Sequence, residues 1–139
     1  MSGRRALAEM PGPADLAFEQ QGDVVVVELR GEVELSNARE IDQTLRGAVS
    51  NAALGIVIDL SHVTYFDTSA VQMLFVLAGW LGRRSQRLRL VVPEGAVIAR
   101  ELDVAEIETA ARVFATVPDA VAELRAGLAQ PSHEPDPPA

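Results

Sequence analysis

The chain contains neither cysteine nor lysine, and these two absences exclude several kinds of chemistry. Without cysteine there is no disulfide framework, no thiolate nucleophile and no cysteine-bound metal. Because all 12 basic residues are arginine, the chain also lacks the amine of a Schiff base or of a phosphate-binding loop. The two histidines lie far apart, so we expect no metal site and no cofactor.

Positive charge and long apolar runs are also scarce. With 20 acidic residues against 12 basic ones, the net charge of −8 argues against a nucleic-acid partner. No run reaches the roughly 18 apolar residues that a membrane-spanning helix needs, and no signal-peptide core follows Arg4 and Arg5. We therefore expect a cytoplasmic protein without direct membrane insertion.

The length and composition indicate one globular domain. A chain of 139 residues with 48% hydrophobic content is sufficient for one core. Both ends are rich in proline and poor in apolar residues. We predict a flexible N-terminal segment at residues 1–13, a folded domain at 14–128 and a disordered, acidic, proline-rich tail at 129–139.

Strand and helix patterns alternate within the predicted domain. The four consecutive valines at 24–27 strongly favour a strand. The pattern predicts an α/β fold in which a mixed sheet of four to five strands, beginning with a hairpin, packs with about four helices. The expected strands are 15–20, 24–30, 56–60, 88–92 and a short one near 113–115; the expected helices are 37–49, 67–81, 96–102 and 118–128.

Two of the helix starts carry polar side chains suited to capping. Asn37, followed three residues later by Glu40, has the spacing of a capping box. After strand 56–60 we expect a polar loop at 61–66 and then a helix capped by Asp67. Thr68 and Ser69 then occupy the first turn, where amide donors are free and the helix dipole is positive. A hydroxyl there tolerates a phosphate, although such a tripeptide alone more often marks only a helix start.

The order of these segments resembles the STAS domain, and more specifically the bacterial anti-sigma-factor antagonists. The resemblance covers about residues 15–128. It rests on a GELD-like turn at Gly31-Glu32-Val33-Glu34, an IDLS-like strand at Ile58-Asp59-Leu60-Ser61 and a DSSG-like helix start at Asp67-Thr68-Ser69-Ala70. In that family a partner anti-sigma factor with serine kinase activity phosphorylates a serine that corresponds to Ser69, and Thr68 is a second candidate.

The resemblance implies a partner switch rather than an enzyme. The unphosphorylated protein would bind the anti-sigma factor and release a sigma factor for transcription, phosphorylation of Ser69 would abolish binding, and a serine phosphatase would reset the switch. The alternative is a non-phosphorylated STAS scaffold, or an accessory subunit of a stressosome-like or membrane transport complex. The residues expected to contact the partner are Glu32, Glu34, Ser36, Asn37, Asp67, Thr68, Ser69, Ala70, Gln72 and Met73.

Several other polar residues have structural interpretations. Asp59 follows a buried strand, but without a lysine or a second acidic cluster we expect it only to end that strand. Arg83, Arg84, Arg87 and Arg89 form a basic cluster that we expect to be a solvated face after its helix, with an electrostatic contact to a partner as the alternative. Trp80 lies off the apolar stripe of that helix, which leaves packing and a surface contact equally open.

Overall fold

The structure, a computed structural model, describes residues 2–9 and 13–129. Its elements are β1 (Ser2–Glu9), β2 (Ala14–Gln21), β3 (Val24–Val33), α1 (Leu35–Ala48), β4 (Gly55–Phe66), α2 (Thr68–Arg83), β5 (Arg87–Val91), α3 (Ala99–Val104), the 3-10 turn η1 (Ile107–Thr109), β6 (Arg112–Phe114) and α4 (Val117–Ala129). The predicted α/β class with a mixed sheet is confirmed. The described strands form one sheet in the order β1-β2-β3-β4-β5-β6.

The N-terminal segment differs from the expectation. Ser2–Glu9 is a strand, β1, which pairs antiparallel with β2, so this part of residues 1–13 is not frayed as predicted. Its pairing with β2 gives hydrogen-bond partners to part of its backbone, which a composition-based prediction does not consider. The sheet accordingly has one strand more than expected. Most of the predicted tail, residues 130–139, lies outside the described residues.

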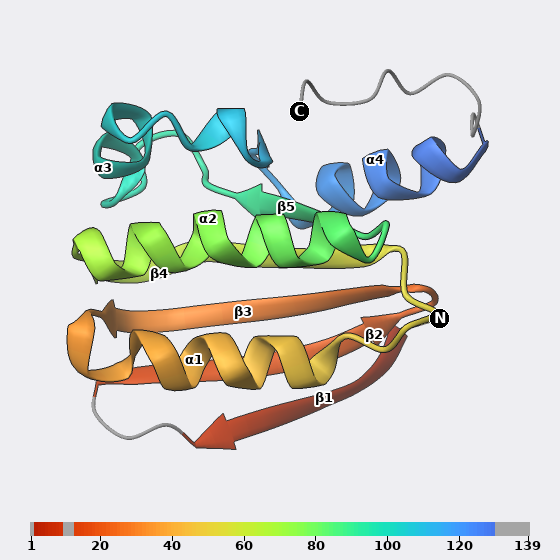
Figure 1. The fold of residues 1–139 in the computed structure, drawn as a ribbon, viewed down its shortest axis with the longest axis horizontal. Coiled ribbons are helices and arrows are strands. Elements are labelled where there is room, and N and C mark those ends of the chain that lie inside the picture. Colours follow the sequence, from red (N-terminus) through yellow and green to blue (C-terminus); the bar gives the residue numbers. More distant parts are fainter. Residues whose placement is uncertain (1, 10–12, 130–139) are drawn as a thin grey trace.

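The two faces of the sheet are covered by different helices (Figure 1). The pairs β3–β4, β4–β5 and β5–β6 are parallel, and their crossovers lay α1 and α2 on the same face. In β3, Val25 and Val27 belong to the large core under these helices, whereas Val24 and Val26 belong to a smaller cluster under α4. Because β3 is buried on both faces, these four positions form an unbroken apolar run rather than an alternation of apolar and polar residues.

Strand β4 is longer than its sequence suggests. The predicted polar loop at 61–66 is wrong, because these residues continue the strand to Phe66. Opposite β3, two register shifts each add one residue to β4. Such bulges let a strand carry polar residues while Val63 and Phe66 still reach the core. The extension brings the end of β4 level with the end of β3, where α1 and α2 both begin.

Candidate functional site

One carboxylate holds the first turns of both α1 and α2. As predicted, Asp67 is the N-cap of α2, and its Oδ1 accepts a hydrogen bond from the amide of Ala70 at 3.0 Å. Its Oδ2 accepts a second bond from the amide of Leu35, in α1, at 2.9 Å. Its own amide donates to the carbonyl of Val33 at 3.2 Å. The two helices, which both start at the left of Figure 1, are therefore aligned at their first residues.

The start of α1 differs from the prediction that Asn37 and Glu40 form its capping box. The N-cap is Glu34, whose carboxylate accepts bonds from the amide and the hydroxyl of Ser36. Asn37 occupies the third helical position, where its Oδ1 accepts from the amide of Glu34 at 2.9 Å and its Nδ2 donates to the carbonyl of Glu32 at 3.0 Å. The cap thus lies three residues earlier, because Glu34 has extended backbone angles and its carboxylate accepts a hydrogen bond from the amide of Ser36, two residues ahead.

Ser69 lies beside a shallow groove between α1 and α2, which we call the α1–α2 groove. Its volume is about 540 Å³, and its lining residues are Leu35, Ala38, Arg39, Asp42, Ser69, Gln72, Met73 and Val76. Leu35 is 77% exposed and Val76 is 52% exposed, so apolar surface reaches solvent along the groove. Ser69 itself is partly exposed. A hydroxyl at the edge of an exposed apolar strip is accessible to a modifying enzyme and to a docking partner.

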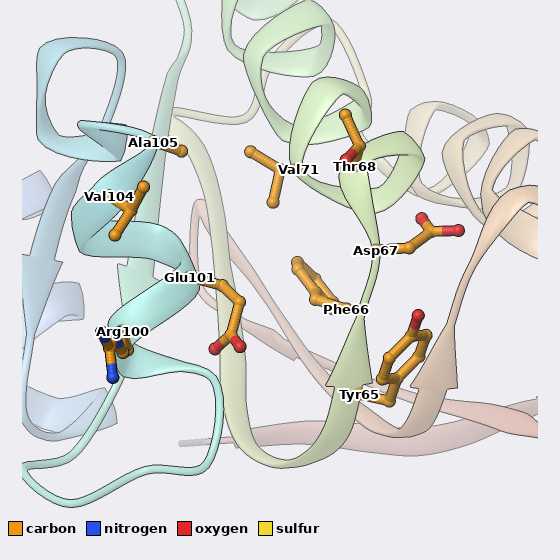
Figure 2. A pocket seen from close by; sticks show the side chains of 9 residues that line it. All are labelled: Tyr65, Phe66, Asp67, Thr68, Val71, Arg100, Glu101, Val104 and Ala105. Atoms are coloured by element: carbon orange, nitrogen blue, oxygen red, sulfur yellow. The ribbon is translucent and has the colours of Figure 1, made fainter.

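Thr68 faces a different hollow, which we call the α2–α3 pocket (Figure 2). This pocket of about 470 Å³ lies between the start of α2 and helix α3, and Figure 2 shows Glu101 and Val104 of α3 on the side opposite Val71. Its lining residues are Tyr65, Phe66, Asp67, Thr68, Val71, Arg100, Glu101, Val104 and Ala105. The two adjacent hydroxyls of the motif therefore border two separate surfaces, one on each side of α2.

Three of the predicted contact residues are buried, which corrects their expected role at the surface. Asn37 is 1% exposed and satisfies the backbone of the α1 start, and Ala70 is 0% exposed within the core. Met73 is 6% exposed and forms part of the groove floor. The turn of the helix directs these three side chains inward, which their positions in the sequence alone do not show. The predicted residues that remain at least partly exposed are Glu32, Glu34, Ser36, Asp67, Thr68, Ser69 and Gln72.

The groove also contains residues that the sequence analysis did not single out. Leu35 follows the N-cap, and Val76 lies outside the apolar stripe predicted for α2. The sequence did contain a signal for these residues. An apolar residue outside the periodic apolar positions of a helix points away from the core. Arg39 and Asp42 carry the charge on the α1 side of the groove.

The basic cluster after α2 is only partly the solvated face that we expected: Arg83 and Arg87 are exposed, whereas Arg84 is partly buried and Arg89 is buried. Arg84 lies over the ring of Trp80 at 4.3 Å and donates to the carbonyl of Val49 at 3.2 Å. Arg89 is buried, and its Nε lies 2.6 Å from Oε1 of Glu123 in α4. Each of these two arginines connects two elements. Arg84 joins the end of α2 to the end of α1, and Arg89 joins β5 to α4.

Asp59 and His62 both make contacts close to their own place in β4 and the neighbouring strand. Asp59 accepts hydrogen bonds from the amide and the hydroxyl of Ser61, a local role within the first bulge of β4 rather than at the strand's end. His62 lies 3.3 Å from Glu28. Among residues 2–9 and 13–129 no group of three or more potential ligands is placed to hold a metal ion. His133 lies outside the described residues.

The fold and the sequence together identify the family. A family profile described as "Mlab, STAS domain" matches residues 16–118, so the chain belongs to the STAS-domain family. The anti-sigma-F factor antagonist RsfB of Mycobacterium tuberculosis is 25% identical over 118 residues, which cover 84% of this chain and 94% of RsfB. The chain is therefore a distant homologue of anti-sigma factor antagonists.

Solved structures have the same fold. The crystal structure of an anti-sigma factor antagonist from Mycobacterium paratuberculosis aligns with a TM-score of 0.72 at 22% identity, covering 85% of this chain and 99% of that one. Unphosphorylated SpoIIAA, also an anti-sigma factor antagonist, aligns with a TM-score of 0.65 at 19% identity, covering 80% and 96%. The predicted STAS fold is thus confirmed. None of the helices in the described ranges is long and apolar enough to cross a membrane.

Proposed function

We propose that the protein is an anti-sigma factor antagonist that binds an anti-sigma factor through the surface around Ser69. The observation that carries the proposal is the position of Ser69 beside the α1–α2 groove, where Leu35 and Val76 remain exposed and Asp67 aligns the two helices. Binding would cover this apolar surface and occupy the anti-sigma factor, which would then release its sigma factor in the cytoplasm.

Phosphorylation of Ser69 by the anti-sigma factor would end that interaction. The phosphate adds roughly −1.5 to −2 charges to a surface that already carries Glu32, Glu34 and Asp67. A like-charge pair about 4 Å apart in an intermediate dielectric opposes binding by about 4 kcal/mol, and each ~1.4 kcal/mol changes affinity tenfold. The free protein tolerates the same phosphate better, because the positive end of α2 faces it.

A binding assay with matched hydroxyl variants tests this proposal. Each anti-sigma factor of the source organism is produced singly, and its affinity for this protein is measured by calorimetry. We expect wild type and Ser69→Ala to bind one of them with similar affinity, and Ser69→Asp to bind at least tenfold more weakly. Thr68→Asp adds the same charge beside the α2–α3 pocket on the other side of α2, so it should weaken binding less than Ser69→Asp does. If Ser69→Asp binds as well as Ser69→Ala, the proposed switch is wrong.

Phosphopeptide mapping tests the modification itself. Protein isolated from its own cells should carry phosphate on Ser69 during unstressed growth and lose it under one stress, through a serine phosphatase. The alternative assignment, a STAS scaffold or transport-complex subunit, predicts no phosphate on Ser69 or Thr68 under any condition and copurification with that larger complex.

A further inference from the structure

Arg39 is a cation of the α1–α2 groove that has no partner among the described residues. It is exposed and lines the groove together with Ser69. Within the described residues it makes no ion pair and no side-chain hydrogen bond. Arg46, two turns further along α1, is in contrast occupied, because it pairs with Asp42 at 3.0 Å and lies 5.0 Å from the centre of the Trp80 ring.

The alignment of the two helices brings Arg39 toward Ser69. Leu35 and Asp67 are level, since the amide of one donates to the carboxylate of the other. Arg39 is four residues beyond Leu35 and Ser69 is two beyond Asp67, which at ~1.5 Å per residue is an axial offset of roughly 3 Å. Side chains on a helix lean toward its N-terminus, so Arg39 leans back across this offset. Packed helices lie about 8–10 Å apart, a gap that an arginine side chain largely spans.

The neighbouring acids leave Arg39 available for an anion. Asp42, the carboxylate nearest to it along the groove, is held by Arg46. Both oxygens of Asp67 already accept backbone amides, those of Ala70 and Leu35. A phosphate on Ser69 would therefore be the group in this groove that most needs a positive partner, and the planar guanidinium donates two parallel hydrogen bonds to phosphate oxygens.

We infer that Arg39 is the internal receptor for the phosphate on Ser69. The inference deepens the proposed function and rests on its claim that Ser69 is phosphorylated. In the modified protein the guanidinium of Arg39 binds the phosphate across the α1–α2 groove. The pair lies over the apolar strip between Leu35 and Val76, so phosphorylation closes the docking surface as well as charging it. Arg39 thereby sets how completely the phosphorylated form releases its partner.

Phosphorus NMR on protein with phosphoserine genetically encoded at position 69 tests this directly. The phosphate of free phosphoserine titrates near pH 6, and a bound guanidinium favours the dianion. We expect the titration midpoint in Arg39→Gln to lie about one pH unit above that of the unsubstituted protein, at the low end of the roughly 1–3 units that an adjacent arginine produces on a carboxylate. Arg100→Gln, which removes the same charge from the α2–α3 pocket, should leave the midpoint unchanged.

The outcomes separate this inference from the proposed function. Equal midpoints in the unsubstituted protein and Arg39→Gln, or an equal rise in Arg100→Gln, would overturn the role of Arg39. The measurement requires neither a kinase nor an anti-sigma factor, so it stands even if no anti-sigma factor binds. If one does bind, phosphorylated Arg39→Gln should bind it several-fold more tightly than phosphorylated wild type, because its groove stays open. Equal affinities of these two phosphorylated proteins would show that Arg39 does not close the groove.

Discussion

The two ends of the α1–α2 pair are fastened in different ways. At the C-terminal end, Trp80 of α2 packs against the core, and its ring is contacted by the guanidinium groups of Arg46 and Arg84. Arg84 also donates to the side chain of Asn51 at 2.9 Å. The Trp80 ring, the two guanidinium groups and Asn51 thus form one connected set of contacts, which we call the closed contact. At the N-terminal end the fastening is the carboxylate of Asp67, which bonds to two backbone amides.

Because of this difference, we expect a partner to bind at the N-terminal end of the helix pair rather than at the C-terminal end. The contact at Trp80 is made by side chains of both helices, so these side chains are not available to a partner. The contact at Asp67 is made with backbone amides and leaves the neighbouring side chains exposed. Leu35 and Ser69 can therefore meet another protein without loss of the helix alignment. We expect substitutions at the closed end to affect stability alone, and substitutions at the open end to affect binding as well.

The largest effect on stability should come from Trp80→Ala. Removing a tryptophan packed on the core costs about 3 kcal/mol, the low end of the range for large aromatic residues because Trp80 is only partly buried. Urea denaturation followed by circular dichroism measures the change. Tyr65→Ala, which removes an exposed aromatic side chain near Asp67, is the control and should cost less than about 1 kcal/mol. Equal losses in both variants would contradict the closed contact at Trp80.

A smaller loss of stability, with loss of binding, is expected for Asp67→Ala. Two amides lose their acceptor, which costs about 2 kcal/mol and releases α1 from α2. Affinity for the anti-sigma factor should fall more than tenfold, measured by calorimetry at a temperature where the variant is folded. Asp67→Asn keeps one acceptor oxygen and should lose about half as much stability. Binding at wild-type affinity by folded Asp67→Ala would mean that helix alignment does not matter for docking.

The next smaller effect belongs to Arg84→Gln, which removes one cation from Trp80. The loss of this contact and of the bond to the Val49 carbonyl should cost about 1 kcal/mol, again measured by urea denaturation. Arg83→Gln, an exposed neighbour, should stay within about 0.5 kcal/mol of wild type. Folded Arg84→Gln should keep wild-type affinity for the anti-sigma factor. A clear loss of affinity would contradict the expectation that the C-terminal end of the helix pair affects stability alone.

The smallest effect on stability should come from Ser69→Ala. No hydrogen bond from the Ser69 hydroxyl to a described residue holds the fold, so the free energy of unfolding should stay within about 0.5 kcal/mol of wild type. Thermal melting, compared with that of Thr68→Ala, measures it. A loss of more than 1 kcal/mol would assign Ser69 a structural role and weaken its interpretation as a residue kept for modification.

Local signals predicted part of this site, and contacts between distant elements account for the rest. The cap at Asp67 was predictable, because an aspartate that follows a buried strand and precedes an apolar helix is commonly the N-cap of that helix. Its bond to Leu35, 32 residues away in the chain, was not, because it depends on β3 and β4 ending at the same level. Arg84 contacts Trp80, which lies only four residues earlier, so this pair was open to prediction. The partner of the buried Arg89, Glu123, is 34 residues away and is brought near it only by the complete fold.

The order of the strands has a consequence for how the chain folds during synthesis. Each strand in the described sheet neighbours the strand before it in sequence, so the sheet can grow from its first strand onward as the chain leaves the ribosome. The face under α1 and α2 is complete before α4 has been made. The cluster of Val24, Val26 and Val57 on the other face stays exposed until α4 covers it. A nascent or truncated chain that ends before α4 would therefore already have the Ser69 surface. The other face of its sheet would still be exposed and prone to aggregation.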